Sequence, residues 1–418
     1  MKLTIIKVFF FLVILSLASF SLRRNDWLAK SFEAAEVQYT HMLQTNANLK
    51  QYPRSYHNDT VPTYTGINDW TGGFWPGCLW YVYDYTRKNK WKDAATTWTE
   101  SLEANQFNTT HHDIGFMMYC SYGNAYRLTQ NPKYKSVLVQ SAKSLITRFN
   151  PKVGAIKSWN EFKSWGSGKV YNYPVIIDNM INLELLFFAS KVTGDASYKR
   201  VAIKHAEITL KNHFRESGSS YHVVCYDSIS GRVLTRETAQ GLADNSVWAR
   251  GQAWAIYGYT MMYRETHDHR FLNAAIRMAQ FYLNAPTLPT DQIPYWDFNA
   301  GQPGYKANWN YDSQRYSPAP RDAAAAAVTC SALLELSTYT SAMLSKSFFN
   351  RAQAMLKSLS SPAYLAKPGT NANFLLMHST GNMPKQSEID VPIVYADYYY
   401  LEALLRYKQL TKNRPLKF

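Results

Sequence analysis

The amino-acid sequence predicts an all-α fold, an (α/α)6 barrel of six inner and six outer helices, because two types of helix alternate along the chain. The first type is amphipathic and recurs from Tyr134, Tyr198 and Phe271, each time with an aromatic residue at its start and alanine eight residues later. The second type is poor in charge and apolar on all sides. A helix with one polar face lies at a surface and an apolar helix is buried, so a ring of outer helices should surround a ring of inner ones.

Six outer helices are expected in total. A looser copy of the repeated pattern begins at Phe348, and amphipathic stretches near residues 28–45 and 91–106 complete the set. Apolar residues recur in these stretches at spacings of three and four, which is the helical period.

Six inner helices are expected between them, each opened by a cluster of Trp, Asp, His or Arg. These openings lie at residues 69–77, 111–116, 176–180, 244–254, 321–327 and 394–400. In such a barrel they converge at one end, where aromatic walls and a few polar groups favour a small-ligand site that could hold sugar rings. The rim should be formed by long loops rich in Gly, Trp, Asn and Tyr, at residues 159–173, 221–244 and 296–316.

Residues 1–21 have the features of a secretory signal peptide. Lys2 and Lys7 precede the apolar run 8–17, and small residues follow. The run is too short for a membrane span, and no cysteine follows it to carry a lipid anchor. We therefore expect an exported protein, periplasmic or secreted. Residues 22–418 are expected to form a single (α/α)6-barrel domain, and the protein is expected to be a monomer.

The net charge and the cysteine content limit which binding partners and which bound groups are expected. The formal charge of +15 at pH 7 favours anionic ligands, but no block of Lys and Arg is long enough for a nucleic-acid-binding arm. The four cysteines are scattered, without the paired spacing of a zinc site, and are expected to be buried hydrophobes. The adjacent His111 and His112 cannot share one helical face, and no carboxylate stands at metal spacing. We therefore expect neither a metal nor a cofactor.

Two acids stand out, Asp113 in the segment HHDIGF and Asp178 in the segment IIDNM, because each opens an inner helix. One interpretation of Asp178 is a helix cap, since Asp is favoured at that position. The other is a functional carboxylate. The second interpretation is favoured because a lone cap has no reason to share its setting with five other polar, aromatic-rich openings.

Other polar and aromatic residues of the inner helices have structural interpretations. Asp322 and Asp397 open the fifth and sixth inner helices and are expected to cap them. Trp254, Tyr257 and Tyr259 lie further along the fourth inner helix and are expected in the core.

Taken in order, the segments HHDIGF, IIDNMINL and DNSVWARGQAW resemble those of the unsaturated glucuronyl hydrolases, glycoside hydrolase family 88. The resemblance covers nearly the whole chain after the signal peptide, from about Trp70 to the helix IVYADYYYLEALL. It implies a catalytic domain that removes the Δ4,5-unsaturated uronic acid from the non-reducing end of oligosaccharides made by polysaccharide lyases. The substrate would be an anionic fragment of a glycosaminoglycan or a related uronate polysaccharide.

The resemblance also implies roles for individual residues. Asp178 matches the general acid/base, which protonates C4 of the vinyl ether and activates the water that adds at C5. Asp113 matches the acid that holds sugar hydroxyls and tunes its partner. Ser379 and Lys385 match the place where family members contact the next sugar, which can carry sulfate, although Asn382 stands where a second hydroxyl is expected. The substrate-binding residues implied in this way are His222, Gln240, Trp248, Arg250, Trp70, Trp75, Trp159, Ser379 and Lys385.

Elementary electrostatics agrees with the acid role of Asp178. A carboxyl group donates a proton near neutrality only if apolar burial or a neighbouring carboxylate raises its pKa. Ile177 and Met180 flank Asp178, and Asp113 is expected across the pocket. A helix N-terminus lowers the pKa by less than about one unit, whereas complete burial raises it by about 3–5 units, so an upward shift is expected. Arg250 is expected to meet the carboxylate of the substrate, which matches the guanidinium fork.

Three alternative functions are compatible with the residues. The unsaturated rhamnogalacturonyl hydrolases share the barrel and the chemistry but act on pectin fragments, although HHDIGF and SVWARGQAW favour the glucuronyl type. An inverting glycosidase would use two carboxylates on either side of the glycosidic bond, with room for water. A non-catalytic envelope protein could capture anionic glycans in the same pocket.

Overall fold

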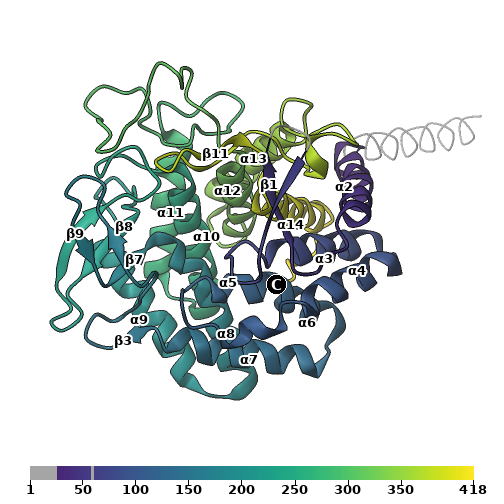
Figure 1. Cartoon of the computed structure of the whole chain (residues 1–418), viewed down its shortest axis with the longest axis horizontal. Coiled ribbons are helices and arrows are strands. Elements are labelled where there is room, and N and C mark those ends of the chain that lie inside the picture. The colour runs from purple at the N-terminus through teal and green to yellow at the C-terminus, as the bar shows by residue number, and fades with distance from the viewer. Residues whose placement is uncertain (1–25, 58–60) are drawn as a thin grey trace, which may run out of the picture.

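The computed structural model describes residues 26–57 and 61–418, and Figure 1 shows them as a barrel of helices. Inner and outer helices alternate along the described chain, which confirms the predicted (α/α)6 barrel. The predicted signal peptide at residues 1–21 lies outside the described residues. Within the described ranges, no helix is both long and apolar enough to cross a membrane.

The outer helices are amphipathic and bury one face each, as predicted. Three of them are capped by the side chains of Asn131, Asp195 and Asp268, which accept hydrogen bonds from backbone N–H groups two residues further on. These caps start the helices earlier than the aromatic residues at which the repeated pattern begins. The outer helices are α2 (Asp26–Thr45), α4 (Asn89–Glu100), α7 (Pro132–Ile146), α9 (Ala196–Asn212), α11 (His269–Asn284) and α13 (Ala342–Leu359).

The inner helices are the most deeply buried elements, and every residue of the fifth, α12, is buried. This helix packs against the fourth and sixth, α10 and α14, near the middle of Figure 1. The second and third inner helices are interrupted: the second contains a π-helical turn, and the third begins as a 3-10 helix. The inner elements are α3 (Phe74–Thr86), α5 (Ile114–Met118) with η2 (Tyr119–Gly123) and α6 (Asn124–Thr129), η3 (Ile177–Asn182) with α8 (Leu183–Thr193), α10 (Ala249–Thr266), α12 (Ala323–Leu336) and α14 (Val394–Thr411).

Close packing of the second and third inner helices depends on Gly115. A Cβ atom added there would lie 2.5 Å from the side chain of Asn182, whose Oδ1 accepts a hydrogen bond from the backbone N–H of Phe116. No larger residue fits this approach. The contact brings the start of α5 against η3, and with it Asp113 toward Asp178.

Short antiparallel strands occur in the connections, where the sequence predicted irregular loops. The expected loops 159–173 and 221–244 each contain strands, and Val175 of β7 pairs with Val224 of β8. Strands of two to six residues are too short to show a clear alternation. The pairs are β1 (Tyr52–His57) with β2 (Val61–Thr65), β3 (Phe149–Asn150) with β4 (Ala155–Ile156), β5 (Phe162–Lys163) with β6 (Val170–Tyr171), and β10 (Ser379–Asn382) with β11 (Ser387–Val391); β7 (Pro174–Ile176), β8 (Val223–Tyr226) and β9 (Val233–Glu237) form one sheet.

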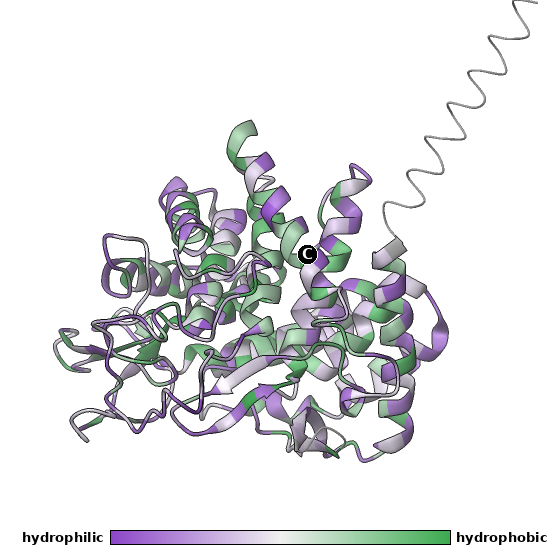
Figure 2. Ribbon diagram, turned by 90° about the horizontal axis from the view of Figure 1, so that it is seen from above, coloured by the Kyte–Doolittle hydropathy of each residue, from purple (hydrophilic) through white to green (hydrophobic). Residues whose placement is uncertain are grey.

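Hydropathy follows this arrangement. In Figure 2 the hydrophobic colour is concentrated on the helices, whereas the peripheral loops are mostly hydrophilic. The four cysteines are buried and unpaired, as predicted, and Trp254, Tyr257 and Tyr259 all belong to the core.

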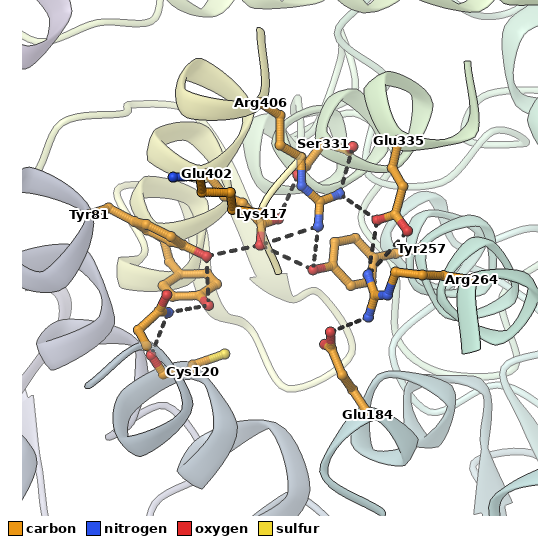
Figure 3. A network of polar contacts seen from close by, with 12 residues as sticks. Tyr81, Cys120, Glu184, Tyr257, Arg264, Ser331, Glu335, Glu402, Arg406 and Lys417 are labelled. Atoms are coloured by element: carbon orange, nitrogen blue, oxygen red, sulfur yellow. Dashed lines mark hydrogen bonds and ion pairs between the residues drawn. The ribbon is translucent and has the colours of Figure 1, made fainter. Parts of the chain in front are cut away.

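The inner helices carry a buried ionic network beyond their N-terminal turns that sequence analysis did not predict (Figure 3). Glu335 lies between two guanidinium groups, with its Oε1 3.1 Å from Nη1 of Arg264 and its Oε2 3.0 Å from Nη1 of Arg406. Arg264 also pairs with Glu184, and Glu402 accepts hydrogen bonds from the hydroxyl groups of Tyr81, Tyr257 and Ser331. A cavity of about 400 Å³ borders this network, and it contains none of the predicted site residues.

Candidate active site

A cavity of about 340 Å³ lies at the N-terminal ends of the inner helices. It brings together eight of the eleven residues that the sequence predicted for the site. These are Asp113, Asp178, Gln240, Trp248, Arg250, Trp70, Trp159 and Lys385. The convergence of the polar helix openings at one end of the barrel is therefore confirmed.

Asp113 lies between two histidines, at the position immediately before α5. Its Oδ2 is 3.2 Å from Nδ1 of His111, and its Oδ1 is 3.1 Å from Nε2 of His112. Asn182 donates from its Nδ2 to Nδ1 of His112, which leaves the proton of that ring on Nε2, facing Asp113. Burial alone would raise the pKa of Asp113, but His112 and His111 outweigh it and hold the pKa well below its usual range. Asp113 is therefore an anion.

His111 and His112, whose spacing in the sequence does not suit a metal site, each direct a ring nitrogen at the carboxylate of Asp113. Among the described residues, no group of three or more His, Cys, Asp or Glu side chains is arranged to hold a metal ion.

Asp178 lies in η3, directly after β7, and its side chain keeps 15% of its surface exposed toward the cavity. The residue in the capping position is Ile176, and no side chain caps this helix, so the capping interpretation of Asp178 is wrong. Burial raises the pKa of Asp178 to about 7, the charge of Asp113 adds to the shift, and Arg250 opposes it. A carboxyl group with this pKa can both give and take a proton near neutrality.

His222 is the residue immediately before β8 (Val223–Tyr226), and its ring faces Asp178. Its Nδ1 accepts from the backbone N–H groups of Ala239 (3.2 Å) and Gln240 (3.3 Å), so the proton lies on Nε2, 3.7 Å from Oδ2 of Asp178. Burial, with a contribution from Arg250, lowers the pKa of His222 well below its usual range and keeps the ring neutral. His222 does not line the cavity itself. Its ring packs on Trp248, with ring centroids 4.4 Å apart.

Arg250 lines the cavity and already has an internal partner, Asp322, so its charge is balanced without a ligand; its contact with the substrate carboxylate stays a prediction. The guanidinium is 1% exposed, and its Nη1 lies 2.6 Å from Oδ2 of Asp322. It also donates to the backbone oxygens of Thr380 and Gly381, and it lies over the ring of Trp248, 4.7 Å from the centroid. A buried Arg needs a counter-charge at all times, and Asp322 supplies it.

The two expected caps behave differently. Asp322 does cap α12, because its Oδ1 accepts from the backbone N–H of Ala325. Asp397 does not cap α14: its carboxylate accepts from the backbone N–H groups of Leu375 and Leu376 and from the hydroxyl of Tyr39. That expectation is wrong because a preceding loop offers buried donors that need an acceptor.

Besides His222, two expected site residues do not reach the cavity. Trp75 is 1% exposed and packs edge-on against Tyr39 and Trp98 of the outer helices, because it lies about 100° around α3 from Phe74, which packs on Phe116 of the next inner helix. Ser379 is fully buried and pairs with Val391 in the β10–β11 ladder.

Other residues line the cavity without having been predicted. Tyr395 lies in the sixth inner opening, where its position could have been noticed. Arg54 of β1 and Glu388 of β11 form an ion pair of 2.6 Å across 334 positions of the sequence. A pair between residues so far apart in the chain cannot be predicted from residue spacing in a single sequence.

The chain matches a known protein family and several known proteins. The model of Glycosyl Hydrolase Family 88 matches residues 42–285 of the chain. An unsaturated glucuronyl hydrolase of Formosa agariphila is 45% identical over 387 residues, which covers 92% of this chain and 91% of that protein. An unsaturated chondroitin disaccharide hydrolase of Streptococcus agalactiae is 32% identical over 397 residues, or 92% of this chain and 93% of that protein.

A solved structure agrees in fold as well as in sequence. The crystal structure of an unsaturated glucuronyl hydrolase specific for heparin matches with a TM-score of 0.85 at 46% identity, over 93% of this chain and 98% of that chain.

Proposed function

Because the chain belongs to glycosyl hydrolase family 88 and is a glycosidase of that family, we propose that it releases the Δ4,5-unsaturated uronic acid from the non-reducing end of lyase-generated oligosaccharides by hydrating the C4=C5 double bond. One observation carries this proposal. Asp178 is a buried carboxyl group with a pKa of about 7, next to an anionic Asp113, in a cavity with tryptophan walls.

The chemistry requires a single group that first donates and then accepts a proton. Protonated Asp178 gives its proton to C4 of the vinyl ether, and positive charge develops at C5. The carboxylate that remains removes a proton from a water molecule as its oxygen adds to C5. The product is a hemiketal, which opens and releases the next sugar. Asp178 ends the cycle protonated, as it began.

The neighbours of Asp178 have supporting parts in this proposal. Asp113 raises the pKa of Asp178 and accepts hydrogen bonds from sugar hydroxyls. The N–H of His222 faces the carboxyl group of Asp178 from 3.7 Å. Trp248, with Trp70 or Trp159, offers an aromatic face to the sugar ring.

The relatives favour a glycosaminoglycan fragment as the substrate. One carries chondroitin disaccharide in its name and another is described as specific for heparin. The formal charge of +15 suits such an anionic substrate. We also propose that the enzyme is exported, periplasmic or secreted, and acts as a monomer. The lysines and apolar run at the N-terminus support export.

The test is a panel of unsaturated disaccharides that differ in linkage and sulfation, followed by loss of their conjugated alkene absorbance. With the best substrate, heavy-oxygen water should label C5 of the released uronate, heavy water should place deuterium on C4, and the saturated analogue should be inert. Label on C1 together with cleavage of the saturated analogue would instead show an inverting glycosidase.

A further inference from the structure

A buried chain of hydrogen bonds links the helix that carries Asp178 to the carboxylate of Asp113. Asn182 is the last residue of η3, the 3-10 helix that also contains Asp178. The Nδ2 atom of Asn182 lies 3.1 Å from Nδ1 of His112, and Nε2 of His112 lies 3.1 Å from Oδ1 of Asp113. The side chains of Asn182 and His112 are fully buried. The helix that holds the proposed acid therefore also reaches the second carboxylate, through one imidazole ring.

The orientation of the Asn182 amide is fixed by a backbone group. The N–H of Phe116 donates to Oδ1 of Asn182 at 2.8 Å, and a backbone N–H can only donate. Oδ1 therefore faces Phe116, and the Nδ2 group, which can only donate, faces His112. The ring nitrogen that it meets must accept, so Nδ1 of His112 carries no proton. A doubly protonated ring would set an N–H of His112 against an N–H of Asn182.

The neutral state of His112 matters for the charge of Asp113. A neutral ring gives Asp113 a hydrogen bond but no opposite full charge. An imidazolium ring would form an ion pair with Asp113 and compensate the charge by which Asp113 raises the pKa of Asp178. It would also make Asp113 a weaker acceptor for the sugar hydroxyls of the proposed reaction. An amide at position 182 prevents this second protonation, whereas a carboxylate would favour it.

The other histidine beside Asp113 is less strictly controlled. His111 has a similar partner, because Nδ2 of Asn108 lies 3.2 Å from its Nε2, but its side chain is 16% exposed. Burial lowers the pKa of His111, and the hydrogen bond and charge of Asp113 outweigh burial and raise the pKa above its usual value. His111 can therefore exchange protons with solvent, while His112 is held by the protein. Other titratable groups near the His112–Asp113 pair are Asp178, Arg148 and His205.

We propose that Asn182 is a positioning residue of the proposed reaction: it keeps His112 neutral, with an N–H toward Asp113, so that Asp113 accepts a hydrogen bond and retains its negative charge. The inference rests on the proposed function, in which Asp113 and Asp178 act together. Asn182→Asp is the critical substitution, because it preserves the size of the side chain and an acceptor for Phe116. Its second oxygen would accept from Nδ1 of His112, and the ring would then hold two protons between two carboxylates.

The first test observes the ring itself by 15N NMR of protein labelled at histidine. The two nitrogens of a neutral imidazole have widely different shifts, whereas those of an imidazolium are nearly equal. The His112 ring, assigned by its NOE contacts with the β-hydrogens of residue 182, should carry a proton on Nε2 alone in the parent at pH 7. It should be doubly protonated in Asn182→Asp. An imidazolium in the parent, or a neutral ring in the variant, would overturn the proposal.

The second test is a double-mutant cycle on turnover. Asn182→Asp should lower kcat by about tenfold in the parent, which corresponds to a change of about one pKa unit in the coupling of the two carboxyl groups. In the Asp113→Asn background it should change kcat by less than about twofold, because the charge on which it acts is gone. Asn131→Asp is the matched control at the cap of α7, where Asp caps as well as Asn, and it should leave kcat unchanged.

The outcomes separate this inference from the proposed function. Equal losses from Asn182→Asp in both backgrounds, with normal turnover by the parent, would show a merely structural role for Asn182 and leave the proposed function intact. A parent enzyme that does not hydrolyse any unsaturated disaccharide would overturn the proposed function itself, and with it the part of Asn182 in the reaction.

Discussion

The Nε2 nitrogen of His222 lies 3.7 Å from Oδ2 of Asp178, and within the described chain neither buried atom has a hydrogen-bond partner. The backbone N–H groups of Ala239 and Gln240 occupy the other ring nitrogen and thereby fix the proton on Nε2. A neutral N–H group thus faces a carboxyl group with a pKa of about 7. The neutral ring therefore supplies no counter-charge that would lower the pKa of Asp178.

Asp178→Asn should lower kcat by about a hundredfold to ten-thousandfold, the usual contribution of general acid–base catalysis, while substrate binding is retained. Turnover is measured by loss of alkene absorbance and binding by titration calorimetry. Asp195→Asn makes the same chemical change at the exposed cap of α9, where Asn caps equally well, and should leave kcat unchanged. A tenth of the parent rate remaining in Asp178→Asn would refute the acid/base assignment.

The same variant should be at least as stable as the parent at pH 8. The pKa of Asp178 is raised in the folded protein, so the carboxyl group favours folding at low pH and this contribution is lost as the pH rises from about 4 through about 7. The side chain of Asn carries no charge at any pH, so the variant does not lose this stability as the pH rises. Thermal melting at pH 5 and pH 8 tests the prediction, and a markedly lower melting temperature in Asp178→Asn would point to a structural role.

The pH dependence of kcat should change in Asp113→Asn. The first step needs protonated Asp178, so parent activity should fall as the pH rises through about 7. The negative charge of Asp113 raises that pKa, and its removal lowers it, so the alkaline limb should move to lower pH. The variant should also be severely impaired, and the profile is measured on its residual rate. An unmoved limb would mean that the two carboxyl groups are not coupled.

Dialysis against a chelator should not change activity. In the proposed reaction Asp178 supplies the proton and activates the water, so no Lewis acid is needed, and the described residues include no cluster of three metal-binding side chains. The measurement is the rate before and after dialysis, with and without added divalent ions. Loss of activity that a specific metal restores would contradict the mechanism.

Glu335→Gln should lower the free energy of unfolding by about 3–5 kcal/mol, because it leaves Arg264 and Arg406 partly uncompensated in a buried network. Glu207→Gln is the control, since Glu207 pairs with Arg270 at the surface and should contribute less than about 1 kcal/mol. Urea denaturation followed by circular dichroism measures both. Equal effects would show that the network is solvated.

The fold was predictable from the sequence because helix periodicity and burial are local properties. Amphipathic outer helices such as α9 alternate with apolar inner helices such as α12. This alternation can be recognised from residues that are close together in the sequence. The short strands were missed for the opposite reason, because β7 and β8 are stabilised by each other and not by their own sequences. The choice of Trp75 failed for a similar reason, because the rotation of α3 against its neighbours decides which of two adjacent aromatic residues, about 100° apart, faces the barrel axis.

The sequence by itself determined which chemistry the molecule carries: two acids and several tryptophans at the openings of inner helices, in an order that identifies the family. Only the tertiary structure decided which partner each charge meets. Asp113 became an anion because two histidines face it, Asp178 an acid with a pKa of about 7 because burial outweighs Arg250, and Arg250 an internal partner of Asp322. The physical reason is that helix periodicity depends on residues three or four positions apart. Electrostatic energies depend instead on distances in space between groups that are far apart in the sequence.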